Sequence, residues 1–78
     1  MEWLPLESRA LSSVAYVESE RMLYLRFKSG EIYRYFGFSP DQYQEFLAAD
    51  SKGQYFAAHV RDQFPFERVP RARGTATS

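Results

Sequence analysis

Between residues 11 and 38 apolar and polar positions alternate along the chain. The segments 11–17, 22–28 and 31–38 each place apolar side chains at every second position, which is typical of β-strands. Short polar stretches separate the three segments. The pattern therefore predicts a β-meander of three antiparallel strands joined by tight turns.

The turn at residues 29–30 allows two registers between the second and third strands. In a two-residue loop Leu25 would lie opposite Arg34, which places a cation in an apolar stripe. In a three-residue loop, with Gly30 in the left-handed position of a G1 bulge, Leu25 lies opposite Tyr33 instead. We prefer the bulged register because it separates the polar from the apolar side chains.

This register gives the predicted sheet two different faces. The first is expected to be the core and carries Val14, Tyr16, Leu23, Leu25, Tyr33 and Tyr35. The second mixes aliphatic, aromatic and basic side chains, namely Ala15, Val17, Met22, Tyr24, Arg26, Lys28, Ile32, Arg34 and Phe36. An antiparallel sheet often turns one face to solvent, so the second face is expected to meet water or a partner.

Helical signals follow the strands over residues 39–50 and 51–65. Ser39 has the position of an N-cap, Pro40 that of the first helical residue, and Gln42 completes a capping box. Two narrow apolar stripes at helical spacing are formed by Tyr43, Phe46 and Leu47, and by Phe56, Val60 and Phe64. The sequence thus predicts an α+β fold, a three-stranded antiparallel β-meander followed by two α-helices packed on one face.

The two ends of the chain carry weaker signals. Residues 1–69 are expected to form a single domain, in which residues 66–69 strap Phe66 and Val69 onto the body. Residues 70–78 have nothing apolar enough to bury, and we expect a disordered tail there. Residues 1–10 leave two alternatives: Trp3 and Leu4 pack against an edge of the sheet or a helix, or they lie across the second face and cover it.

Composition limits the chemistry that 78 residues can carry. The aromatic content is 18%, which lets a short chain bury much apolar area, and cysteine is absent, which excludes disulfides, thiolate nucleophiles and Cys-based zinc sites. The single histidine, His59, precedes Asp62 by three residues, but no motif places a nucleophile or a metal-ligand set. We therefore expect neither catalysis nor a cofactor or metal.

Charge and hydropathy bear on location and partners. The ten basic residues less Arg71 and Arg73 leave eight in residues 1–69 against ten acidic ones, a net charge of minus two. Binding of a nucleic acid would therefore need a local basic patch. No secretory signal or membrane-length apolar run is present, so we expect a cytoplasmic protein without a membrane partner.

An ordered set of motifs then resembles the KTSC domain, a module found at the C-terminus of some lysyl-tRNA synthetases and as a stand-alone protein. The matching stretches are "SSVAYV", "LYLRFKSGEIYRYFGF", "SPDQYQEFLAADSKGQYF" and "HVRDQF". The hallmarks are a Y-x-Y, an S-x-G-x-Y-F and a downstream arginine, here Tyr33, Tyr35, Ser51, Gly53, Tyr55, Phe56 and Arg61. Ala57 departs from the pattern, which has asparagine there. The synthetase context implies RNA as a partner.

Two functional hypotheses compete for the second face. The first is a non-catalytic module for single-stranded RNA or tRNA that uses Tyr24, Arg26, Lys28, Arg34 and Phe36, with Lys52 and Arg61 as a second basic group. The alternative is a protein partner or a second copy of the chain held by the same face. The remaining motif residues, from Tyr33 to Phe56, are expected to be structural. Ser51-Lys52-Gly53 is either a phosphate site or a corner between helices, and we prefer the corner.

Overall fold

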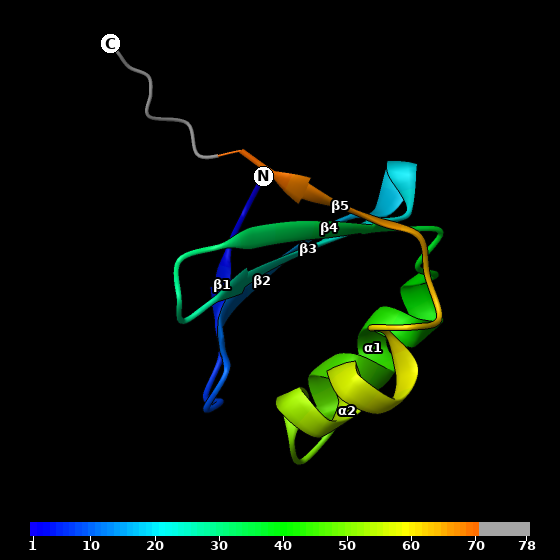
Figure 1. The fold of residues 1–78 in the computed structure, drawn as a ribbon. Helices are drawn as coiled ribbons and strands as arrows, with labels where there is room; N and C mark the ends of the chain where they lie inside the picture. The colour runs from blue at the N-terminus through cyan, green and yellow to red at the C-terminus, as the bar shows by residue number, and fades with distance from the viewer. Residues whose placement is uncertain (71–78) are drawn as a thin grey trace, which may run out of the picture.

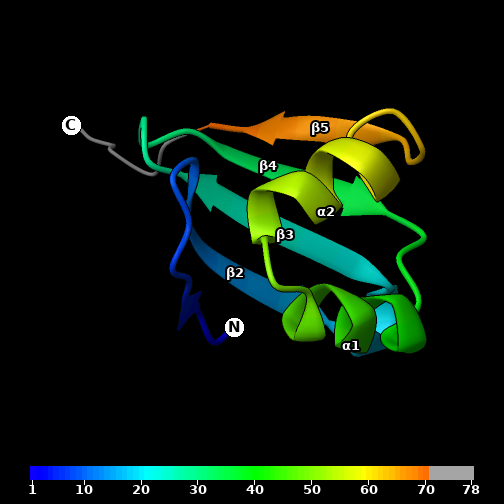
Figure 2. The ribbon, with the colours of Figure 1, turned by 90° about the horizontal axis from the view of Figure 1, so that it is seen from below.

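A five-stranded antiparallel sheet forms one layer of the molecule in the computed structural model, which describes residues 1–70 (Figure 1). The strands are β1 (Leu4–Pro5), β2 (Leu11–Val17), β3 (Met22–Phe27), β4 (Ile32–Phe36) and β5 (Phe66–Val69), and they are neighbours in the order of the chain. The helices α1 (Pro40–Ala48) and α2 (Lys52–His59) lie between β4 and β5 in sequence. Figure 2 shows both helices on the same face of the sheet.

The α+β fold and the meander β2-β3-β4 are confirmed, but the expected number of three strands is wrong. The additional strands are the two edges: β1 pairs with β2 through Leu4 and Val14, and β5 pairs with β4 through Phe66 and Tyr35. With two and four residues, these strands are too short to show a clear alternation. The segment interpreted as a strap is thus the edge strand β5. Residues 71–78, most of the predicted tail, lie outside the described residues.

The bulged register of the β3-β4 hairpin is confirmed. Leu25 lies opposite Tyr33, and Gly30 has a φ of 98°, in the left-handed region that glycine adopts without strain. The Gly30 amide donates to the Phe27 carbonyl, and the Phe27 amide donates to the Glu31 carbonyl, both at 2.8 Å. These bonds close the loop and fix which side chains face each side of the sheet.

The start of α1 follows the predicted capping box. The Gln42 amide donates to Ser39 Oγ at 3.1 Å, and the Ser39 amide donates to Gln42 Oε1 at 2.9 Å. The helix ends at Ala48, two residues before the predicted end. On its inner side the Tyr43 ring stacks on Tyr16 of β2, with 4.5 Å between ring centroids, which fixes α1 against the sheet.

The second helix is shorter than predicted, because it ends at His59 and not near residue 65. The amides of Val60 and Arg61 both donate to the Phe56 carbonyl, at 3.0 and 2.9 Å, and the chain then leaves the helix. Phe64 still reaches the core, where its ring meets Phe38. The early end lets the chain turn back and place β5 beside β4.

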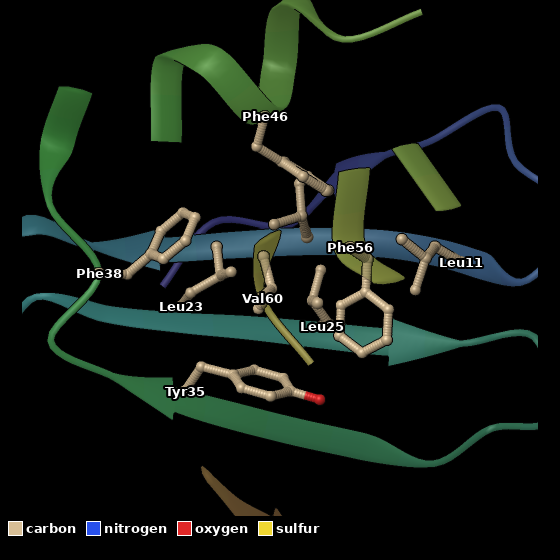
Figure 3. Close-up of a cluster of buried hydrophobic side chains, with 9 residues drawn as sticks. Leu11, Leu23, Leu25, Tyr35, Phe38, Phe46, Phe56 and Val60 are labelled. Atoms are coloured by element: carbon tan, nitrogen blue, oxygen red, sulfur yellow. The ribbon is translucent and has the colours of Figure 1, made fainter. Parts of the chain in front are cut away.

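The core lies between the sheet and the two helices. Its buried members are Leu11, Val14, Leu23, Leu25, Tyr35, Phe38, Phe46, Phe56 and Val60 (Figure 3). Every second residue of β3 and β4, and of β2 from Val14 onward, thus points into this layer, as the alternation predicts. A register shift between Leu11 and Ser13 brings Leu11 to the same side. We call this side of the sheet the covered face. None of the helices within residues 1–70 is both long and apolar enough to span a membrane.

Candidate functional site

In the described part of the chain, the opposite side of the sheet carries no α-helix, and only the short 3-10 helix η1 (Glu18–Glu20), between β2 and β3, lies at its end (Figure 1). We call this side the open face, and by register it holds Ala15, Val17, Met22, Tyr24, Arg26, Ile32, Arg34, Phe36, Glu67 and Val69. The residues Tyr24, Arg34 and Glu67 stand directly side by side across β3, β4 and β5. Most of the open-face side chains are half-buried by their neighbours in the sheet, so the face is a nearly continuous surface of rings, aliphatic chains and guanidinium groups.

Trp3 joins the open face from the N-terminal edge. Its ring centroid lies 6.4 Å from that of Tyr24, and the Arg26 guanidinium carbon lies 4.5 Å from the Trp3 ring centroid, a cation–π contact. The intervening Ala15 of β2 is fully buried, and its small side chain leaves room for the indole. Trp3 therefore covers the β2 side of the open face and extends it by one ring, while β4 is left uncovered. Of the two alternatives for the N-terminal residues, Trp3 thus lies over part of the open face, while Leu4 belongs to an edge strand that pairs with β2.

Arg34 lies at the centre of the uncovered part. Its Nε donates to Glu67 Oε1 at 2.6 Å, and the guanidinium carbon lies 5.7 Å from the Phe36 ring centroid. The Tyr24 hydroxyl and the Glu67 carboxylate both raise the pKa of Arg34, so the guanidinium stays charged. Its side chain is 36% exposed and that of Glu67 is 53% exposed. The carboxylate from β5 was missed by sequence reasoning, because residues 66–69 were not interpreted as a strand.

The other predicted basic residues lie apart from this surface. Lys28 is exposed in the β3-β4 turn, one residue beyond the end of β3. Lys52 Nζ donates to the Ala49 carbonyl at 2.6 Å, across the corner between the helices, while Arg61 follows the far end of α2. Eight helical residues span about 12 Å, so Lys52 and Arg61 do not form one basic group.

Ser51-Lys52-Gly53 forms the corner between α1 and α2. Ser51 Oγ accepts from the Gln54 amide at 3.2 Å, and the Lys52 ammonium is held by a carbonyl, so both groups that would bind a phosphate have partners. Gly53 belongs to the first turn of α2, and a Cβ built on it would lie 3.7 Å from Ser8 Oγ, an ordinary contact. The geometry is that of the corner.

Tyr55 links the two helices. Its hydroxyl donates to Glu45 Oε1 at 3.0 Å, and its ring centroid lies 4.7 Å from that of His59. Burial, together with the hydrogen bond to Glu45, raises the pKa of Tyr55 to about 12. His59 thus packs on a ring at the end of α2. Among residues 1–70 no group of three histidines and carboxylates is arranged to hold a metal ion.

The remaining motif residues converge at the β4-β5 edge of the covered face. Five rings follow one another in a closed circuit, with centroid distances between 5.5 and 5.8 Å, in the order Phe27, Phe56, Tyr35, Phe66, Tyr33 and back to Phe27. We call this circuit the ring cage. It borders a cavity of about 380 Å³, which Ser29, Glu31 and Arg61 also line. Both tyrosines, Phe56 and Arg61 come from the motifs, and no argument from the sequence placed them together.

Comparison with known proteins agrees with these motifs. A family model of the KTSC domain matches residues 7–64. The chain belongs to the KTSC domain family. Its sequence is similar to that of a protein from Tsukamurella paurometabola, with 35% identity over 60 residues that cover 77% of this chain and 90% of the relative.

Two further relatives extend the comparison. A lysine–tRNA ligase of Nostoc punctiforme is 30% identical over 63 residues, which are 81% of this chain but 11% of the ligase. The crystal structure of a KTSC domain protein from Yersinia pestis superimposes with a TM-score of 0.86 at 28% identity, over 88% of this chain and 97% of that one. Similarity to this chain therefore covers most of two small proteins and a short segment of a much larger enzyme.

Proposed function

We propose that this KTSC domain is a non-catalytic binding module that takes single-stranded RNA on its open face. The observation that carries the proposal is the alternation of rings and guanidinium groups across the uncovered strands: Arg26 lies over Trp3, and Arg34 lies beside Phe36. Exposed rings on a sheet stack with bases, and guanidinium groups contact both the bases and the phosphates between them. The open face offers both kinds of contact.

The relatives support RNA over other partners. The segment of the Nostoc punctiforme ligase that is similar to this chain belongs to an enzyme named for joining lysine to a tRNA. The two predicted ligands, single-stranded RNA and tRNA, share phosphates and unstacked bases. A tRNA loop would therefore meet the open face in the same way as a short single strand.

The pair of Arg34 and Glu67 sets how strongly RNA binds. In the free protein the carboxylate satisfies the guanidinium, so a phosphate has to displace Glu67 to reach it. This competition, together with the acidic balance of the domain, predicts weak and strongly salt-dependent binding. The same pair holds β5 against β4 on the open face, so RNA binding and the conformation of the β5 side chains are coupled.

The first experiment is a backbone amide NMR titration of the full chain with a single-stranded RNA of about ten nucleotides, at about 50 and 200 mM salt. We expect saturable shifts at Trp3 and in residues 22–36 that weaken at the higher salt. Counterion release by bound arginines is the physical reason. The absence of saturable shifts at the lower salt would reject the proposal.

Two substitutions sharpen the test. Arg34→Gln removes one phosphate contact, so the slope of log affinity against log salt should fall by about one. Glu67→Gln leaves the arginine without its carboxylate, and affinity should rise about two- to fivefold at low salt. Glu7→Gln is the matched control, because it makes the same change of charge in the loop before β2. If Glu67→Gln and Glu7→Gln raised the affinity equally, the net charge of the protein would explain the effect, and the Arg34–Glu67 pair would have no specific role.

A protein partner or a second copy of the chain remains the alternative occupant of the open face. The half-buried aliphatic side chains of Val17, Met22 and Ile32 would then carry the contact. Amide shifts that depend on protein concentration, without RNA and undiminished by salt, would favour a second copy. The RNA proposal predicts no such dependence.

A further inference from the structure

The ring cage has the features of a binding pocket that packing alone does not explain. The five rings border an open hollow of about 380 Å³ that no side chain fills, which is near the lower end of the usual size of small-molecule sites. Phe66, one of its walls, is 55% exposed. A ligand in the hollow would bury this large apolar ring further, which favours binding.

A tyrosine hydroxyl without a protein partner among the described residues faces this cavity. Tyr35 is 3% exposed and lines the cavity, and its hydroxyl has no hydrogen-bond partner within residues 1–70. In Figure 3 its oxygen lies at the tip of the ring, beside Phe56. This oxygen is not among the fully buried polar atoms of the described residues, so it is open to the cavity and able to bond to a ligand there. Burial raises the pKa of Tyr35 to about 12, which keeps this hydroxyl protonated and able to donate.

Arg61 indicates which charge a ligand of this cavity would carry. Its side chain lines the same cavity from the segment after α2 and is 60% exposed, and its Nε lies 3.9 Å from Asp62, a distant contact. The other charge at the rim, Glu31, is paired with Arg68 at 3.5 Å. Tyr35 and Arg61 are both donors, so the group that satisfies them is an acceptor with negative charge.

We propose that the ring cage binds a small aromatic carboxylate, with the ring of the ligand among the five rings and its carboxylate on Arg61 and the Tyr35 hydroxyl. A ring makes offset or edge-to-face contacts with the cage, which already arranges its own members in that way. The site lies on the opposite side of the sheet from the open face, and it does not depend on RNA binding. Free aromatic acids and the C-terminus of a peptide that ends in phenylalanine present the same group.

Phenylacetate is the first probe, because it has one ring and one carboxylate. We expect saturable amide shifts in β4, at Phe56 and at Phe66, with a dissociation constant in the millimolar range that is usual for so small a molecule. Phenylacetamide has the same shape without the charge and should bind about five- to tenfold more weakly. Acetyl-alanyl-phenylalanine, compared with its C-terminal amide, tests the peptide as a source of the same group.

Three variants distinguish the contributions of the two hydrogen-bond donors from an effect of net charge. Arg61→Gln should weaken phenylacetate about five- to tenfold and leave phenylacetamide unchanged, because it removes only the charged donor. Tyr35→Phe keeps the ring and should weaken phenylacetate about threefold. Arg9→Gln, in the exposed loop before β2, removes the same charge away from the cage and should have no effect.

Three results would overturn the proposal. Tighter binding of benzyltrimethylammonium than of phenylacetate would make the cage a cation site, which is the other known use of aromatic cages. Equal affinities of Arg61→Gln and Arg9→Gln would remove the assigned role of Arg61. The absence of saturable shifts up to tens of millimolar phenylacetate, in a protein whose amide spectrum is folded, would make the cage purely structural.

Discussion

The covered and open faces of the sheet carry aromatic side chains on the same strands but pair them differently. On the covered face rings meet rings, as in the stack of Tyr16 on Tyr43 and the edge contact of Tyr35 with Phe56. On the open face the rings of Trp3 and Phe36 meet guanidinium groups, and Trp3 meets the ring of Tyr24 as well. An aromatic-rich strand therefore does not show by itself whether its rings belong to the core or to a binding surface. The groups that each ring contacts in the folded protein determine which of the two it is.

The largest expected difference between the two faces is in stability. Leu25 is fully buried on the covered face, and Leu25→Ala should lower the free energy of unfolding by about 3 kcal/mol through lost burial and a cavity. Ile32 is half-buried on the open face of the next strand, and Ile32→Ala should cost about 1 kcal/mol. Urea unfolding of both variants measures the difference. Equal losses would mean that a partner or a second copy buries the open face.

A smaller effect is expected at high pH from the covered face alone. The folded-state pKa of Tyr35 is raised by burial to about 12 from an ordinary value of 10, so the unfolded chain loses this proton first. The stabilisation is complete below pH 10 and is lost as the pH rises through 12, and it amounts to at most about 2–3 kcal/mol, because each pKa unit corresponds to about 1.4 kcal/mol. Unfolding measured from pH 9 to 12 should therefore be flatter in Tyr35→Phe than in the native protein. Phe36→Leu, on the open face, removes no titrating group and should keep the native slope.

The N-terminal edge of the open face is expected to contribute still less to the free energy of unfolding. Trp3→Ala removes the cation–π contact with Arg26 and exposes Ala15, and the loss of stability should be about 1 kcal/mol. Amide exchange should increase in β1 and in the adjoining residues of β2. Leu4→Ala is the control, because Leu4 is already 42% exposed. If Leu4→Ala costs as much, the indole has no special role.

The smallest effect belongs to the pair of Arg34 and Glu67, which is exposed to solvent. A double-mutant cycle with Arg34→Gln and Glu67→Gln should give a weak favourable coupling at low salt that disappears near 1 M salt, where the Debye length is about 3 Å. A coupling that survives high salt would show that the pair is shielded from solvent. It would then hold β5 in place more firmly than its exposure implies.

Local sequence patterns predicted much of the fold but much less of the candidate site. The alternation in residues 11–36, the glycine of the bulge and the capping box at Ser39 each predicted the element that is present. The roles given to Tyr24, Arg26 and Arg34 in RNA binding stay predictions. Glu67 was missed, and the position of Trp3 was left open between two alternatives, because both residues reach the open face only through the edge strands β5 and β1.

The sequence by itself determined the central meander, its register, the start of α1 and the division of the sheet into two faces, because each depends on neighbouring residues or on one tight turn. Only the tertiary structure decided that α2 ends at His59 and that β5 returns beside β4. That return brings together residues as distant as Arg34 and Glu67, which are 33 positions apart, and it closes the ring cage with Phe66. Contacts over such separations depend on how the whole chain packs, and no local pattern specifies them.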